Sequence, residues 1–246
     1  MAAPLDLTTR HGFLAALHDL LNPATYLEIG VQHGTSLNLA HRAKVAIGVD
    51  PHPLVPPTGN QVILGMTSDD YFRLIASGDD FRAFSGGDGV LHYRRMLRTK
   101  PLVDLAFIDG MHLSEYAWRD FLGVESICHP RSVVVFDDVL PRNQHEARRI
   151  PVGEPVVGDW TGDVWKVYPC LREMRPGLTC RLVDTRPTGV LVVTGFPDTS
   201  SLSPIAPQHW VTGDDEVPDW VLHRTEAIGP FTALQQIRTE LETLGE

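Results

Sequence analysis

Short apolar segments that end in a glycine or an acidic residue alternate with segments of helical spacing through the first half of the chain. Strands are expected over residues 26–30, 44–50, 61–65, 102–109 and 132–137. Helices are expected over residues 33–41, 68–77, 90–99 and 113–127. This alternation predicts an α/β fold with a doubly wound, mostly parallel sheet. Ligands of such sheets bind beyond the carboxyl ends of the strands, so the terminal residues should meet in one crevice. Those residues are Gly30, Asp50, Gly65, Asp109 and Asp137.

The two ends of the chain add further elements to this sheet. An amphipathic helix is expected over residues 9–21, and residues 180–185 and 189–196 flank a Pro-Thr-Gly turn signal. They predict an antiparallel pair that closes a seven-stranded sheet, so residues 1–196 form one domain. Residues 197–246 then comprise a linker rich in Pro, Ser, Asp and Gly and a helix over residues 231–244. We expect this helical appendage to dock on the site or on a second copy of the chain.

Composition and charge exclude several classes of protein. The net charge of −10 argues against a nucleic-acid surface, because phosphate binding needs a basic face. No segment is long enough to span a bilayer, and the first residues lack the pattern of a secretory signal. The 3 cysteines lie at wide spacings and fit reduced thiols. We therefore expect a cytoplasmic protein that acts on a small molecule, with a homo-oligomer left open.

The first expected strand runs into a turn that carries two glycines, Gly30 and Gly34. Gly30 allows a tight turn against a ligand, and Gly34 allows a close approach at the start of the next helix. Thr35 and Ser36 complete the turn. Neither the Gly-x-Gly-x-x-Gly motif nor a phosphate-cradling loop with its lysine is present. The ligand is therefore not expected to be held by phosphates.

Two acidic residues accompany this turn. Glu28 lies in the strand, and Asp50 ends the next strand, where a carboxylate can accept both hydroxyls of a ribose. S-adenosylmethionine fits this pattern, because it has a ribose diol, two cationic groups and no phosphate. In the alternative reading, the glycines only shape the turn and Glu28 forms a buried ion pair.

Three carboxylates follow the fourth and fifth strands. They are Asp109, Asp137 and Asp138. Unpaired carboxylates at such short range repel one another unless a cation lies between them, and oxygen ligands favour Mg²⁺, Mn²⁺ or Ca²⁺. His112 lies three residues beyond Asp109 and could accept a proton as a general base. Alternatively, Asp137 accepts backbone amides, Asp138 caps the next segment and His112 faces solvent.

The motif residues resemble those of the class I methyltransferases. Glu28, Gly30 and Gly34 stand in the first motif of that family and Asp50 in the second. The segment Gly65-Met66-Thr67-Ser68 stands where the family commonly contacts adenine, so the resemblance implies that Thr67 and Ser68 bind cofactor, together with Asp109.

The second crevice resembles a narrower group, the metal-dependent sugar and natural-product O-methyltransferases and the related cephalosporin hydroxylases. In that group the Asp-Gly-x-His after strand four and the acidic pair after strand five supply metal ligands and, in some members, a histidine base. The resemblance covers residues 25–138 and implies a metal held by Asp109, Asp137 and Asp138, with His112 as catalytic base.

These features predict an S-adenosylmethionine-dependent O-methyltransferase that is assisted by Mg²⁺. Its acceptor would be a hydroxyl of a sugar, polyketide or phenolic metabolite. Acceptor pockets are built from variable loops, here residues 78–89 and the region after Asp138. Residues 158–166, with Trp160, Trp165 and Lys166, could line or cover the substrate. A non-catalytic partner module and a metal-independent methyltransferase remain as alternatives.

Overall fold

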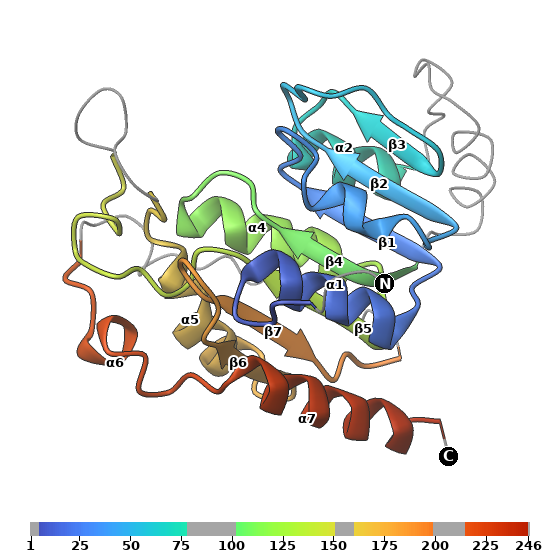
Figure 1. The fold of residues 1–246 in the computed structure, drawn as a ribbon. Helices are drawn as coiled ribbons and strands as arrows, with labels where there is room; N and C mark the ends of the chain where they lie inside the picture. Colours follow the sequence, from blue (N-terminus) through green and yellow to red (C-terminus); the bar gives the residue numbers. More distant parts are fainter. Residues whose placement is uncertain (1–4, 78–101, 151–159, 199–214, 246) are drawn as a thin grey trace.

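A seven-stranded mixed sheet forms the centre of the computed structural model, which describes residues 5–77, 102–150, 160–198 and 215–245 (Figure 1). The strands are β1 (Thr25–Ile29), β2 (Val45–Val49), β3 (Gln61–Leu64), β4 (Val103–Ile108), β5 (Cys128–Phe136), β6 (Thr179–Val183) and β7 (Val190–Thr194). Their order across the sheet is β3-β2-β1-β4-β5-β7-β6. The first five strands are parallel, and β7 pairs antiparallel with both β5 and β6. This arrangement confirms the predicted doubly wound sheet and its closing pair.

Helices cover both faces of the sheet. They are α1 (Arg10–Leu21), α2 (Ser68–Ser77), α4 (Ser114–Glu125), α5 (Val167–Met174), α6 (Asp219–Leu222) and α7 (Pro230–Thr243), with short 3-10 turns η1 (Leu37–Ala40) and η3 (Val164–Lys166). Helices α1 and α7 lie together on one face, and α2, α4 and α5 pack on the other (Figure 1). Within the described ranges, no helix has the length and apolar character needed to cross a bilayer.

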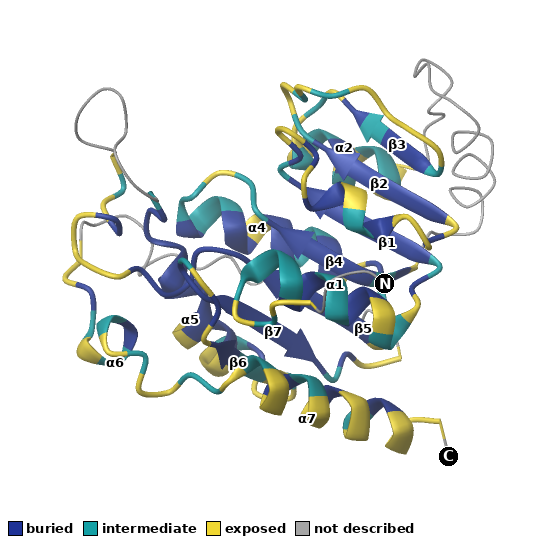
Figure 2. Ribbon diagram, viewed as in Figure 1, coloured by how far each residue is buried: buried dark blue, intermediate teal, exposed yellow. Residues whose placement is uncertain are grey.

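The strands are apolar almost throughout because both of their faces are covered. Every residue of β1, β2 and β7 is buried, as expected for strands between two helical layers (Figure 2). Two apolar clusters result, one on each side of the sheet. Trp118 and Phe121 of α4 lie in one cluster, and Phe13 and Leu17 of α1 lie in the other, all at most 1% exposed.

The helix expected over residues 33–41 is wrong. Only the 3-10 turn Leu37–Ala40 forms there, and Gly34, inside the expected range, has a φ of 68°, which a helix cannot include. The helix expected over residues 90–99 and the loop over residues 78–89 lie outside the described residues.

The C-terminal helix α7 belongs to the core of this chain. Its residues Ala233 and Ile237 are fully buried in the same cluster as α1 and one face of the sheet. Glu240 also receives hydrogen bonds from Arg181 of β6, at 2.7 Å, and from Thr194 of β7, at 2.9 Å. The apolar face that suggested a docking or dimerisation role is therefore covered within the chain.

The three cysteines are free thiols. Burial raises the pKa of Cys170 to about 12 and that of Cys180 to about 11. Both thiols therefore stay protonated near neutral pH, in agreement with the reduced thiols that their spacing indicated.

Candidate active site

The carboxyl ends of the parallel strands meet at one edge of the sheet. The amide of Asp50 donates to Leu64 at 3.1 Å, that of Asp109 to Ile29 at 2.8 Å, and that of Asp137 to Ile108 at 3.0 Å. Each terminal acid is thus tied by its backbone to the end of the neighbouring strand. The predicted meeting of the strand ends at one edge of the sheet is confirmed for these three acids.

Both glycines of the first turn have positive φ values and close neighbours. Gly30 has a φ of 88°, and a Cβ on it would lie 1.9 Å from the carbonyl oxygen of Asp109. Gly34 has a φ of 68°, and a Cβ there would lie 2.9 Å from Val55. Side chains are strained at such φ values, so both positions favour glycine. Gly30 brings the turn against the end of β4, next to the carboxylates that follow it.

Asp50 organises this turn. Its Oδ2 accepts hydrogen bonds from the amides of Val31 at 2.9 Å and Gln32 at 2.8 Å, and its Oδ1 accepts from the amide of His52 at 2.7 Å. A carboxylate has about four acceptor positions, so one remains for a ligand hydroxyl. Asp50 is partly exposed at the carboxyl end of β2, as the proposed ribose contact requires.

Glu28 is enclosed by the protein. Its carboxylate accepts hydrogen bonds from Tyr26 at 2.6 Å and Ser36 at 2.9 Å, and the residue is 0% exposed. Burial raises the pKa of Glu28 to about 8, against the opposing effect of these two hydrogen bonds. Glu28 and Ser36 are therefore buried beneath the turn and stabilise it through their hydrogen bond. Thr35, between Gly34 and Ser36, is exposed to solvent.

The expected adenine segment follows β3. The hydroxyl of Thr67 accepts the amide hydrogen of Asp70 at 3.1 Å, so Thr67 caps helix α2. Ser68 bonds to the buried carboxyl of Asp120 on α4, whose pKa burial raises to about 7. Gly65 is exposed, and nothing lies within 4 Å of the position of a Cβ on it.

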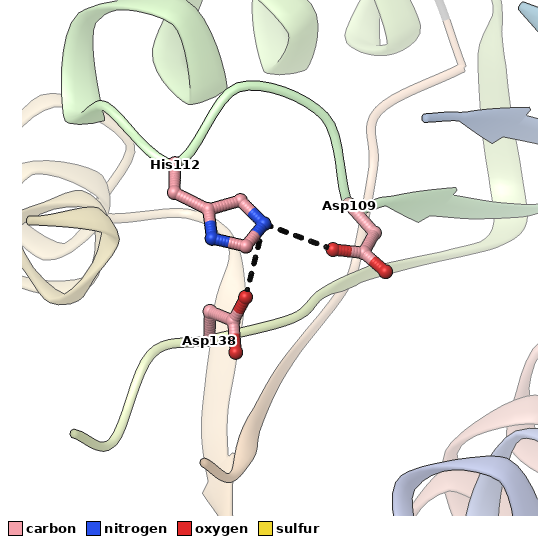
Figure 3. A group of neighbouring side chains, drawn as sticks. All are labelled: Asp109, His112 and Asp138. Atoms are coloured by element: carbon pink, nitrogen blue, oxygen red, sulfur yellow. Dashed lines mark ion pairs between the residues drawn. The ribbon is translucent and has the colours of Figure 1, made fainter. Parts of the chain in front are cut away.

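Asp109, His112 and Asp138 form a compact group at the ends of β4 and β5 (Figure 3). One potential ligand atom from each lies within 4.8 Å of the other two. Nε2 of His112 is 3.4 Å from Oδ1 of Asp109 and 3.2 Å from Oδ2 of Asp138. An oxygen-rich group with one imidazole suits a divalent cation.

The carboxylate of Asp137 is not part of this group and pairs with Arg10 of helix α1. Its Oδ2 contacts Nη1 of Arg10, and its Oδ1 is buried without a hydrogen-bond partner among the described residues. Burial and the charges of Asp138 and Asp109 raise the pKa of Asp137, and the Arg10 guanidinium opposes this rise. Of the three acids expected to hold a metal, Asp109 and Asp138 thus gather around His112, while Asp137 pairs with Arg10.

The ring of His112 is held at both nitrogens. Nδ1 lies 2.5 Å from the carbonyl oxygen of Trp160, which can only accept, and the Trp160 ring stacks on the imidazole at 5.2 Å. Burial lowers the pKa of His112, but the hydrogen bond to Asp109 and the charge of Asp138 outweigh it and raise the pKa to about 9. The imidazole is therefore protonated near neutral pH when only these carboxylates surround it.

The loops around the cluster fix its geometry. Asp138 has a φ of 61°, and its Oδ1 accepts a hydrogen bond from Thr188 at 2.6 Å. Gly162 has a φ of 54°, and a Cβ on it would lie 1.6 Å from the carbonyl oxygen of His112. Asp163 accepts from the amide of Ser114 at the start of α4 at 2.8 Å.

The segment expected to line or cover the substrate is divided over its described part between Trp160 beside the cluster and two buried side chains. Trp160 contacts His112, as above. Trp165 and Lys166 are buried, at 7% and 4% exposure, and Lys166 pairs with Asp163 at 3.1 Å. Residues 158–159 lie outside the described residues.

Sequence reasoning missed three partners of the cluster, namely Arg10, Trp160 as a hydrogen-bond acceptor, and Thr188. Arg10 is 127 residues from Asp137, and Thr188 is 50 residues from Asp138. Residues so far apart carry no shared pattern in one sequence. The only signal for Arg10 was its place at the start of a helix expected to cover the sheet.

Comparison with known proteins agrees with the fold. Residues 27–139 match the family model described as a methyltransferase domain. A putative caffeoyl-CoA O-methyltransferase from Staphylococcus aureus shares 14% identity with a TM-score of 0.50, covering 78% of this chain and 84% of its own. An O-methyltransferase from Bacillus cereus in complex with SAH shares 13% identity with a TM-score of 0.48, covering 79% and 82%. No curated protein matches the chain in sequence.

The matched residues run from β1 to the end of the acidic pair, so they include the glycine turn and the carboxylates of the cluster. The seven-stranded sheet, with its antiparallel closing pair, is the one expected from the sequence. Residues 27–139 of this chain therefore match a methyltransferase domain, and the sheet around them has the expected methyltransferase fold.

Proposed function

We propose that this protein transfers a methyl group from S-adenosylmethionine to a hydroxyl of a small polar metabolite, with Mg²⁺ as an aid. The acceptor class is a sugar, polyketide or phenolic compound. The observation that carries the proposal is the group formed by Asp109, His112 and Asp138, which lies beside the glycine turn of a methyltransferase domain.

The cofactor would lie across the carboxyl ends of β1, β2 and β4. The backbone at Gly30 and Gly34, with Thr35, would face it, and the remaining acceptor position of Asp50 would take a ribose hydroxyl. Thr67 and Ser68 would flank the adenine, and Asp109 would lie near the cationic end. Bound S-adenosylmethionine supplies the electrophilic methyl group. Glu28 and Ser36 support the turn from within, so they contribute to binding through its shape.

The residues at the second crevice fit a divalent cation. Asp109 and Asp138 offer carboxylate oxygens at short range beside His112, and the buried Oδ1 of Asp137 has no partner among the described residues. An unsatisfied buried carboxylate oxygen is costly, and a cation would satisfy it. A bound Mg²⁺ would lower the pKa of an acceptor hydroxyl.

His112 is placed to accept the proton of that hydroxyl. The Trp160 carbonyl holds the hydrogen on Nδ1, so Nε2 is the nitrogen that can take a proton. A base must be neutral before the reaction, and the carboxylates alone keep His112 protonated near neutral pH. A cation bound to these carboxylates would offset their negative charge and so lower the pKa of His112. The imidazole could then be neutral, as a general base must be.

Arg10 supports a second candidate, a methyltransferase that needs no metal. Its guanidinium and the protonated His112 bring two positive charges to the three carboxylates, so the group is partly neutralised by the protein itself. A non-catalytic module with the same fold is the third candidate. Turnover with any acceptor would exclude it.

Chelation separates the first two candidates. We expect a chelator to abolish turnover while leaving cofactor binding intact, because Asp50 and the glycine turn lie on other strands. Full turnover in chelator, with no metal found by elemental analysis, would favour the metal-independent enzyme. His112→Ala should retain cofactor binding and lose about a hundredfold or more in turnover. A cytoplasmic location and a small-molecule partner remain part of this proposal, and homo-oligomerisation remains an open alternative.

A further inference from the structure

The first residue of helix α1 reaches the carboxylate cluster from outside the matched methyltransferase region. Thr9 caps the helix by accepting the amide hydrogen of Gly12 at 3.1 Å. The amide of Arg10 donates to the carbonyl oxygen of Arg186 at 3.1 Å, so the start of the helix is tied to the β6–β7 connection. That connection also supplies Thr188, which bonds to Asp138. The backbone of Arg10 is therefore fixed relative to the cluster.

The Arg10 side chain approaches a different oxygen of Asp109 from the one nearest His112. Its Nη1 contacts Oδ2 of Asp137 and lies 3.9 Å from Oδ2 of Asp109. The side chain of Asp137 is only 1% exposed, whereas that of Arg10 is 29% exposed. A buried carboxylate is costly without a cationic partner, and Arg10 is that partner in this structure.

We propose that Arg10 competes with a divalent cation for Asp137 and so sets the metal affinity of the site. This inference rests on the metal assistance in the proposed function. Asp137 can ligate a cation through its free Oδ1 or, if the guanidinium withdraws, through Oδ2. In both cases the positive charge of Arg10 opposes the approach of a divalent ion to Asp109 and Asp137.

The competition has a consequence for stability as well. Without metal, Arg10 limits the repulsion among Asp109, Asp137 and Asp138. Removing the charge of Arg10 should therefore lower the stability of the metal-free protein. The stability of such a variant should then increase more when the cation binds. The partial exposure of Arg10 gives the side chain room to withdraw without unfolding the helix.

The test is a titration of the full-length protein with Mn²⁺ alone, in the absence of cofactor and acceptor. Binding is measured by calorimetry and by electron paramagnetic resonance. Arg10→Gln should bind Mn²⁺ about tenfold or more tightly than the unmodified protein, because one opposing charge is gone. Its melting temperature should rise more on addition of Mn²⁺ than that of the unmodified protein. Arg10→Lys, which keeps the charge, should bind Mn²⁺ as weakly as the unmodified protein.

Arg42→Gln is the matched control, because Arg42 pairs with Asp19 at the surface and its substitution changes the net charge equally. Its Mn²⁺ affinity should be unchanged. Arg10→Met gives a second neutral variant with an unbranched stem if Arg10→Gln is unstable. In an Asp137→Asn background the effect of the Arg10 substitution should become smaller, since the contested carboxylate is absent and the charge of Arg10 acts only through Asp109.

Unchanged or weaker Mn²⁺ binding by the neutral variants would overturn the competition while leaving metal assistance in place. Failure of the unmodified protein and of every variant to bind Mn²⁺ would overturn both. The methyltransferase assignment is tested separately by cofactor binding.

Discussion

The carbonyl oxygen of Trp160 accepts a hydrogen bond from Nδ1 of His112 at 2.5 Å, and the two rings are stacked. Because the acceptor is a backbone group, the position of His112 depends on the course of the chain through residues 160–163. Gly162 fixes that course, since its φ of 54° and its approach to the His112 carbonyl leave no space for a Cβ.

Gly162→Ala should therefore move His112 and lower turnover by about tenfold or more, because small misplacements of a reacting group are costly. Cofactor affinity should stay unchanged. Gly177→Ala is the control, since nothing lies within 4 Å of the position of a Cβ on Gly177. Steady-state kinetics and cofactor calorimetry check both variants. Full turnover by Gly162→Ala would show that the segment does not position His112.

The buried Glu28 predicts a dependence of stability on pH. Its pKa is about 8 in the folded protein and near 4.5 when exposed, so between these values the folded state holds a proton that the unfolded state has released. The free energy of unfolding should fall as pH rises through this window, by at most about 1.4 kcal/mol per pH unit from this one group. Below pH 4.5 the contribution of Glu28 should be constant.

Glu28→Gln should remove this part of the pH dependence. The amide can accept from Tyr26 and donate to the oxygen of Ser36, so both contacts have a replacement. Denaturant unfolding at several pH values measures the difference between the two proteins. Identical slopes for Glu28→Gln and the unmodified protein would mean that Glu28 titrates normally in the fold.

The pattern of the sequence was sufficient for the sheet and for the convergence of its acids. Each strand was predicted within a few residues, because a strand covered on both faces must be a continuous apolar run. The positions of Asp109 and Asp138 followed from parallel strands ending at one edge. The sequence predicted a helix after Gly34 and not the observed 3-10 turn. The apolar residues of that segment have helical spacing, and the spacing does not show that Gly34 adopts a positive φ.

Helix α5 and the partners of the cluster depended on tertiary structure. Pro169 lies inside α5 and argues against a helix when the sequence is read alone, although it falls in the first turn where proline is tolerated. The pairing of Arg10 with Asp137 arises only after α1 packs on the sheet. For this reason the sequence predicted that a metal ion alone balances the charges of the three carboxylates. In the structure, Arg10 also contributes a positive charge.

Helix α7 allows a test of the domain organisation. Ile237 is 0% exposed and packs with α1 and the sheet, so Ile237→Ala should lower the free energy of unfolding by about 2–5 kcal/mol. Gln235→Ala, at an exposed position on the same helix, should have little effect. Denaturant unfolding and size-exclusion chromatography check the two variants. A change in oligomeric state without a loss of stability would instead support the docking role.

Calorimetric titration of the unmodified protein with S-adenosylhomocysteine, the demethylated product of the proposed cofactor, tests the central claim most directly. We predict one binding site per chain. Asp50→Ala should weaken binding by about 10- to 100-fold through loss of a charge-assisted ribose contact. Asp19→Ala, which removes an equal charge from the exposed surface of α1, should bind like the unmodified protein. Absence of any binding by the unmodified protein would contradict the assignment of a cofactor-dependent methyltransferase.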